Sequence, residues 1–222
     1  MQILYHHQLC PLSRQIRVLL KELNISHTTI REDYWLRRNE FIQKNPLGTV
    51  PVLEVNEKII IVGNYSIIEY LNDTCDDFYF MPEDILTRAE VRKYISRFND
   101  KFYRDVTKVL TDEKMIRLLM RAGEPRSNYI RAAKENLTRH LYFMDDILKT
   151  QSFIVSDKIS CADIVAAAHL SVVDYFGEIN WDGWEAIKNW YSVIKSRPSF
   201  QPILLDRIPG FNPPKYYSNL DF

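Results

Sequence analysis

Two side chains capable of thiol chemistry lie close together near the start of the chain, in the run Cys10-Pro11-Leu12-Ser13. The run falls where a strand pattern gives way to a helical one. A thiol at a helix start is expected to have a lowered pKa and could form a mixed disulfide with a thiol substrate. The Ser13 hydroxyl could donate a hydrogen bond to a bound thiolate, worth about 1.5 to 3 kcal/mol. Two plainer interpretations stay open: Ser13 caps the helix, and Cys10 is a half-buried thiol.

Other chemistries have less support. His6 and His7 are neighbours on a predicted strand and should point to opposite faces, while His140 and His169 have no obvious acidic or cysteine partners. We therefore expect no metal site. The 29 basic and 29 acidic residues balance, so no global field attracts nucleic acid.

Composition indicates a folded intracellular protein. The 222 residues are 46% apolar, enough for one or two hydrophobic cores, and no run approaches the length that spans a bilayer. Cysteines number three and are far apart in the sequence. We expect free thiols, a cytoplasmic location and no membrane insertion.

Periodicity predicts an α/β unit in the first third of the chain. Strand patterns, helical spacing and turn residues predict the order βαβαββα. The strands are expected at 3–5, 28–30, 50–55 and 59–62, and the helices at 16–23, 37–44 and 64–73.

The remainder of the chain reads as helical. Apolar stripes predict helices over 91–102, 129–148 and 184–194, and Ser160 with Asp163 resembles a capping box ahead of a buried helix. The predicted division is an α/β domain at 1–75, a linker at 76–84, an all-helical domain at 85–206 and an extended tail at 207–222.

Two segments carry aromatic and arginine side chains of the kind that dominate binding energy at interfaces. The first contains Trp35, Arg37 and Arg38, in a loop where a large ring between arginines is difficult to bury completely. The alternative is that Trp35 packs on the core of its domain.

The second segment is the tail, which several prolines exclude from a helix and which should run extended along the surface. Its aromatic content is too high for a freely solvated segment, so it is docked on its own body or reserved for a partner. The candidate interaction residues there are Tyr216, Tyr217, Asp221 and Phe222.

Four motifs in order resemble the glutathione transferase superfamily, whose fold is a thioredoxin-like domain followed by an all-helical domain. They are CPLSR (10–14), NPLGTVPVL (45–53), IIEYL (67–71) and the cap at 160–163. The resemblance implies a cis peptide bond at Pro51, which exposes the Val50 backbone to bound glutathione. It also implies that Gly63 and Asn64 replace the pair that grips the γ-glutamyl group. Because Gly63 has no side chain, glutathione would bind weakly and is not required.

Three further segments, at 34–41, 190–200 and 206–222, are similar to one bacterial branch of this superfamily. The branch comprises glutathione-transferase-like cell-division proteins, homodimers that bind FtsZ and are not regarded as working transferases. The resemblance implies a non-catalytic regulator of septal constriction, with other divisome proteins as further partners. The alternative is a glutathione S-transferase that conjugates or reduces small electrophiles through Ser13 or Cys10.

Overall fold

The computed structural model describes residues 2–75 and 78–220. It divides into two compact units, Met1–Phe78 and Tyr79–Phe222. The boundary falls within the segment 76–84 that was predicted to be a linker. We call these the thioredoxin-like unit and the helical unit.

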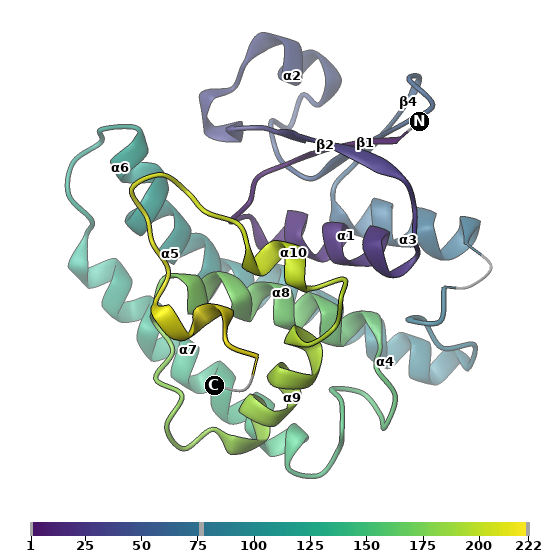
Figure 1. Cartoon of the computed structure of the whole chain (residues 1–222), viewed down its shortest axis with the longest axis vertical. Coiled ribbons are helices and arrows are strands. Elements are labelled where there is room, and N and C mark those ends of the chain that lie inside the picture. The colour runs from purple at the N-terminus through teal and green to yellow at the C-terminus, as the bar shows by residue number, and fades with distance from the viewer. Residues whose placement is uncertain (1, 76–77, 221–222) are drawn as a thin grey trace. The chain divides into compact units, whose positions relative to one another are not determined.

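The thioredoxin-like unit has the predicted order of strands and helices. The elements are β1 (Gln2–His6), α1 (Pro11–Glu22), β2 (His27–Arg31), α2 (Asn39–Lys44), β3 (Val52–Val55), β4 (Ile59–Val62) and α3 (Asn64–Thr74). The sheet order is β2-β1-β3-β4, with β1 and β2 parallel and the other pairs antiparallel. Figure 1 shows α1 and α3 on one face of this sheet and α2 on the other.

Several boundaries differ from the prediction by a few residues, and two of these differences have local reasons. The helix α2 begins at Asn39 rather than at residue 37, because Arg37 has a left-handed φ of 48°. The strand β3 begins at Val52 rather than at residue 50, because Pro51 has no N–H to donate to a neighbouring strand.

The helical unit begins with a continuous helical segment, residues 85–119, in which α-helix alternates with π-helix. Its elements are α4 (Ile85–Ser96), a π-helical stretch (Arg97–Thr107), α5 (Lys108–Thr111), a second π-helical stretch (Asp112–Ile116), α6 (Arg117–Leu119), α7 (Ser127–Leu148), α8 (Cys161–Tyr175), α9 (Glu185–Lys195) and α10 (Gln201–Leu204). Among the described residues, no helix is both long and apolar enough to cross a membrane.

The buried helix α8 starts at the predicted capping box. Every residue of α8 is buried. Asp163 Oδ2 accepts hydrogen bonds from the Ser160 backbone N–H at 2.8 Å and the Ser160 hydroxyl at 2.9 Å, while Oδ1 accepts from Ile154 N–H and Trp190 Nε1–H, both at 2.9 Å. A carboxylate with this many donors can stay buried, and it fixes the start of the central helix.

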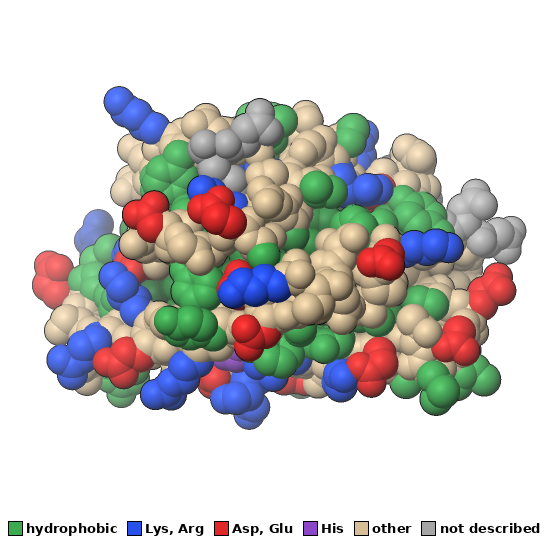
Figure 2. All heavy atoms as spheres, turned by 90° about the horizontal axis from the view of Figure 1, so that it is seen from below, with side chains coloured by type: hydrophobic (Ala, Val, Ile, Leu, Met, Phe, Trp, Pro, Cys, Tyr) green, Lys and Arg blue, Asp and Glu red, His purple; other side chains and the backbone are tan. Residues whose placement is uncertain are grey.

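Charged side chains are mixed on the surface, as the balanced composition leads one to expect. On the face drawn in Figure 2, basic and acidic side chains are intermingled and do not gather by sign. In the part that the structure describes, this face therefore has no patch of a single charge.

Candidate functional site

The Cys10 thiol lies at the N-terminus of α1 but is enclosed. Cys10 is the N-cap residue, its side chain is 4% exposed, and its Sγ lies 3.8 Å from the Val50 carbonyl oxygen. Burial raises the pKa of Cys10 and outweighs the opposing hydrogen bonds from Ser13 and Leu12. The lowered pKa expected from the helix start is therefore wrong, because desolvation of the thiolate dominates here.

Ser13 lies in the first turn of α1 and is fully buried. Its Oγ accepts a hydrogen bond from the His7 backbone N–H at 3.5 Å, and its hydroxyl also favours the thiolate form of Cys10. The interpretation of Ser13 as the helix cap is wrong, since Cys10 occupies that position. The hydroxyl faces its own chain, so a ligand thiolate could reach it only if the surroundings opened.

The expected glutathione segment has the predicted backbone. The Val50–Pro51 peptide bond is cis, as predicted. The Pro51 carbonyl accepts a hydrogen bond from Gly63 N–H at 3.0 Å, which joins the turn before β3 to the start of α3. Gly63 has a φ of 86°, and a Cβ there would meet nothing within 4 Å. Backbone conformation, not space, therefore favours glycine at this position.

Asn64 is the one member of the expected ligand pair with a side chain. It is the first residue of α3 and follows the N-cap residue Gly63. Its side chain is 6% exposed, and within the part of the chain that the structure describes its Nδ2 has no hydrogen-bond partner. A buried amide donor without a partner can serve a carboxylate ligand.

These groups fit only half of a glutathione site. The Asn64 amide and the cis-proline turn suit the carboxylate and backbone of a peptide-like ligand. The thiol end does not fit, because Ser13 and Cys10 are both enclosed. The contact that the resemblance implies at position 63 needs a side chain, which Gly63 does not have; a charge-assisted contact of this kind is worth about 1.5 to 3 kcal/mol, or roughly 10- to 150-fold in affinity. Neither of the two groups that were expected to activate a thiol is therefore accessible.

A second candidate surface surrounds Trp35 in a short 3-10 helix (Tyr34–Leu36). Trp35 is half-buried, and its ring meets the His7 ring edge-on at 5.0 Å and the Tyr34 ring at 5.2 Å. Leu36 is 58% exposed. The two sequence interpretations of Trp35 are both partly right, since one side of the ring packs and the rest is accessible.

His7 supports this surface, although the sequence pattern suggested no role for it beyond that of a metal ligand on a strand, which was not expected, and β1 in fact ends at His6. His7 is fully buried, and burial lowers its pKa to about 3, so the ring is neutral. Its Nδ1 accepts a hydrogen bond from Leu9 N–H at 3.3 Å, so Nε2 carries the proton and points toward Asp33 Oδ1 at 3.8 Å. Burial of a histidine beside a tryptophan is a tertiary feature that the local pattern does not contain.

The two arginines next to Trp35 have different environments. Arg38 forms a two-point salt bridge with the fully buried Glu32, and its side chain remains 48% exposed. Arg37 is exposed, with a left-handed backbone that ends the short helix. Arg38 therefore also holds the loop together, whereas Arg37 and Leu36 are available for contact.

The C-terminal tail is docked on its own helical unit. The Tyr175 hydroxyl on α8 donates to the Phe211 carbonyl at 2.5 Å and accepts from Ile208 N–H at 3.1 Å. Tyr217 is fully buried and meets the Tyr175 ring edge-on at 5.3 Å. The prediction that Tyr217 is an interaction residue is therefore wrong, because its ring belongs to the core.

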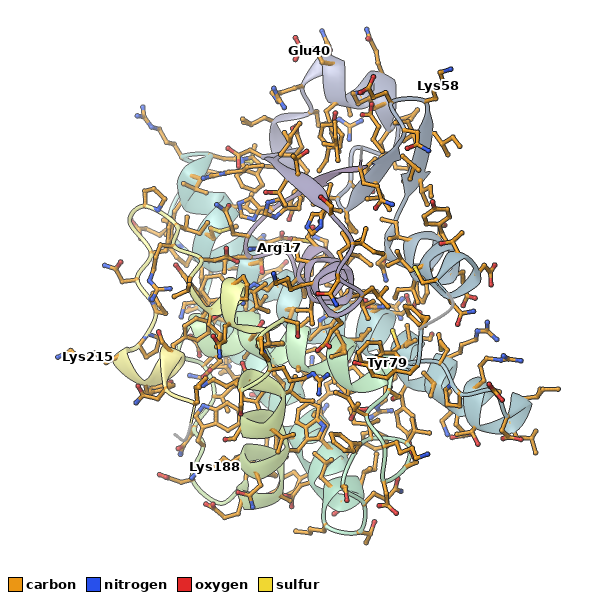
Figure 3. All side chains as sticks on the ribbon, turned by 45° about the vertical axis from the view of Figure 1, so that its right-hand side comes forward. Arg17, Glu40, Lys58, Tyr79, Lys188 and Lys215 are labelled. Atoms are coloured by element: carbon orange, nitrogen blue, oxygen red, sulfur yellow. The ribbon has the colours of Figure 1, made fainter. Side chains whose placement is uncertain are left out.

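The end of the tail is not wholly extended. A short 3-10 helix (Lys215–Ser218) follows Pro214. A proline is tolerated at this position because it lies before the helix, where its missing N–H breaks no helical hydrogen bond. Tyr216 is half-buried, and its pKa is raised by burial and by Asp174 and Glu178. Lys215 projects outward (Figure 3). The predicted contacts at Asp221 and Phe222 lie outside the described residues.

A thioredoxin-like unit with a cis proline just before β3, joined to a helical unit with a capped central helix, defines a protein of the glutathione-transferase type. Family models agree over both units. The "Glutathione S-transferase, N-terminal domain" matches residues 9–74, and the "Glutathione S-transferase, C-terminal domain" matches residues 106–198. The chain belongs to the glutathione transferase superfamily.

The similar proteins include both an FtsZ-localized protein and glutathione S-transferases. The chain is 38% identical to FtsZ-localized protein A of Caulobacter vibrioides, over 99% of this chain and 97% of that protein. The solved structure of FzlA from C. crescentus has a TM-score of 0.95 at 38% identity, covering 100% of this chain and 99% of that one. A glutathione S-transferase structure from Sinorhizobium meliloti has a TM-score of 0.97 at 35% identity, with both chains fully covered.

Proposed function

We propose that this protein is a cell-division regulator that binds FtsZ and promotes septal constriction without catalysis. The observation that carries the proposal is its 38% identity to FtsZ-localized protein A along 99% of the chain. The proposal includes a homodimer that works in the bacterial cytoplasm, where FtsZ polymers form and other divisome proteins are within reach. It requires neither glutathione nor a metal.

The site chemistry supports a contact role over an enzymatic one. The two groups that could activate a thiol are enclosed, with Ser13 fully buried and Cys10 at 4% exposure. The surface at Trp35, Leu36 and Arg37 instead presents aromatic, aliphatic and cationic groups together. Tryptophan and arginine are among the residues that contribute most to binding at protein interfaces.

Co-sedimentation with GTP-assembled FtsZ polymers tests the proposal. The wild-type protein should pellet with the polymers, and Arg37→Glu should weaken binding by about 5- to 30-fold, equivalent to the 1 to 2 kcal/mol of a strong contact residue. Leu205→Ala, at a residue 72% exposed in the helical unit, serves as the control. Failure of the wild-type protein to pellet at any FtsZ concentration would contradict the proposal.

The second candidate function is a glutathione S-transferase, which the unpaired Asn64 amide and the cis Val50–Pro51 bond favour. Calorimetric titration with reduced glutathione separates the two functions. The titration should reach about 10 mM, which is tenfold above a dissociation constant of about 1 mM, equivalent to a binding free energy of roughly 4 kcal/mol. Saturable heat that is lost in Ser13→Ala would support the enzyme. We expect no saturable heat.

A further inference from the structure

The loop that carries Trp35 begins with a residue that cannot itself touch a partner. The loop joins β2 to α2, and Glu32 follows directly after β2 ends at Arg31. The Glu32 side chain is fully buried, at 0% exposure, whereas residues 33–38 are half-buried or exposed. Burial of a carboxylate is costly unless a cation pairs with it, so the contacts of Glu32 show what its burial achieves.

Glu32 joins the two ends of the loop. Its backbone N–H donates to the His6 carbonyl at 2.8 Å, which fixes it at the end of β1. Arg38, the N-cap residue of α2, donates from Nε to Glu32 Oε1 at 3.2 Å and from Nη2 to Oε2. A two-point ion pair fixes orientation as well as distance. We call the Glu32–Arg38 ion pair the loop clasp, because it closes the loop at its base.

The loop between the ends of the clasp is a single helical turn. Leu36 N–H donates to the Asp33 carbonyl at 2.8 Å, and Arg37 N–H donates to the Tyr34 carbonyl at 3.3 Å. Arg31 Nε donates to Asp33 Oδ1 at 2.9 Å. One helical turn is not stable in water by itself, since nucleation costs more than one or two hydrogen bonds return. The turn therefore depends on contacts that hold its ends and its side chains.

Two contacts outside the loop orient the side chains at its surface. The Trp35 ring meets the buried His7 ring edge-on at 5.0 Å. Arg37 lies against Gly48, where an added Cβ would be 3.0 Å from Arg37 Nη1. Leu36 lies between Trp35 and Arg37 in the chain and is 58% exposed. The loop thus presents its three contact residues in one defined arrangement.

Charge alone does not distinguish this loop. Residues 31–40 contain three basic and three acidic side chains. Arg31 pairs with Asp33, and Arg38 pairs with Glu32 and lies 3.7 Å from Glu40. Because the segment has no surplus charge, recognition here depends on how the contact residues are placed.

We propose that Glu32 is a positioning residue for the partner contact. Through Arg38 it holds Trp35, Leu36 and Arg37 in their binding arrangement before the partner arrives. The inference rests on the proposed FtsZ contact at the Trp35 surface. A loop ordered in advance avoids the entropic cost of ordering its side chains when the complex forms. Because Glu32 is fully buried, a change there can alter affinity only through the loop.

The test compares Glu32→Gln with the wild-type protein in two measurements. Glutamine has nearly the size of glutamate but no charge, so Arg38 loses its ionic partner while the packing is kept. In co-sedimentation with GTP-assembled FtsZ polymers, Glu32→Gln should bind about 5- to 30-fold more weakly, the scale of ordering about one or two side chains on binding. In hydrogen exchange without FtsZ, the Leu36 and Arg37 amides should exchange at least about 5-fold faster.

Glu54→Gln is the matched control. Glu54 is also a buried carboxylate of the thioredoxin-like unit, at 7% exposure, and it pairs with Lys44 of α2 at 2.9 Å. This change removes a comparable ion pair, but it should leave FtsZ affinity and the exchange of residues 33–38 unchanged. If Glu32 only stabilised the unit as a whole, the two variants would affect FtsZ affinity equally.

A double variant separates positioning from direct contact by Arg38. Arg38→Gln leaves the Glu32 carboxylate buried without its ion pair, so the loop should open and FtsZ binding should weaken. Adding Glu32→Gln removes that charge and lets the two amides hydrogen-bond. The double variant should therefore bind at least about threefold more tightly than Arg38→Gln alone. If Arg38 acted only by touching FtsZ, the second change would recover no affinity.

Three results would overturn the proposal. The first is wild-type FtsZ affinity in Glu32→Gln, and the second is an equal loss of affinity in Glu54→Gln. The third is unchanged exchange of the Leu36 and Arg37 amides in Glu32→Gln. The exchange measurement needs no FtsZ, so it distinguishes failure of the loop clasp from failure of the proposed function, in which even the wild-type protein would not pellet.

Discussion

A single hydroxyl group, on Tyr175 of α8, holds the C-terminal tail at two points. It accepts from Ile208 N–H at 3.1 Å and donates to the Phe211 carbonyl at 2.5 Å. The change Tyr175→Phe removes both hydrogen bonds and keeps the ring against Tyr217. We expect the tail to remain near its site but to detach more often.

The size of the effect follows from the two lost bonds. Each has a net value of about 0.5 to 1.5 kcal/mol when the freed groups can reach water, so the loss totals about 1 to 3 kcal/mol. That free energy corresponds to a detached population about 5- to 150-fold larger. The apolar packing of Tyr217 should prevent complete release, since this ring is fully buried.

Hydrogen exchange followed by mass spectrometry measures the detachment. Tail peptides covering 205–220 should exchange faster in Tyr175→Phe by the same factor, while peptides from the thioredoxin-like unit should not change. Tyr142→Phe, at a residue 61% exposed in the same unit, is the control. Unchanged exchange of the Ile208 amide would refute the argument that this hydroxyl anchors the tail.

Three further predictions concern buried polar groups. Burial lowers the pKa values of His6, His7 and His169 to about 3. Their folded pKa values lie below the unfolded value near 6.5, so the stability they confer is present above pH 6.5 and is lost as pH falls toward 3. Urea unfolding should therefore show about 3 kcal/mol less stability at pH 5.5 than at pH 6.5, and equal stability would count against buried neutral rings. Because burial raises the pKa of Cys10, its alkylation by iodoacetamide at pH 7.5 should be at least ~10-fold slower than that of free cysteine; an equal rate would show an open thiol. Finally, Asp163→Ala leaves two backbone amides and an indole N–H without their acceptor, and should cost about 3 to 5 kcal/mol in urea unfolding, with Asp163→Asn closer to wild type. Identical losses for the two variants would contradict the hydrogen-bond explanation.

Local patterns in the sequence were enough for the main elements, but not for α5, α6, α10 or the 3-10 turn in the tail. Alternating apolar residues, helical spacing and turn residues depend on neighbours a few positions away, so they predicted the strands, the helices and the hairpin, whose turn has positive φ at Asn56 and Glu57. The cap of Ser160 and Asp163 is local in the same sense. The cis bond at Pro51 and the two-domain fold were expected from the resemblance.

The chemistry of the candidate site required the tertiary structure. The sequence placed Cys10 at the start of a helix, where the helix end favours the thiolate. In the fold, Cys10 is enclosed beside Val50, which is 40 residues away in the chain. This burial raises the pKa of Cys10 instead of lowering it. The aromatic tail posed the same problem. The sequence left open whether the tail packs on its own body or is reserved for a partner. The contact between the Tyr175 and Tyr217 rings shows that Tyr217 packs on its own helical unit.

The sequence by itself therefore determined which segments form helices and strands and how they follow one another, because those preferences come from short-range backbone and side-chain sterics and from apolar periodicity. Only the tertiary structure decided which polar and aromatic groups are buried, since burial is set by distant parts of the chain. Burial controls desolvation, and desolvation determines whether a thiol is reactive, whether a histidine is charged and whether a tyrosine is left to meet a partner.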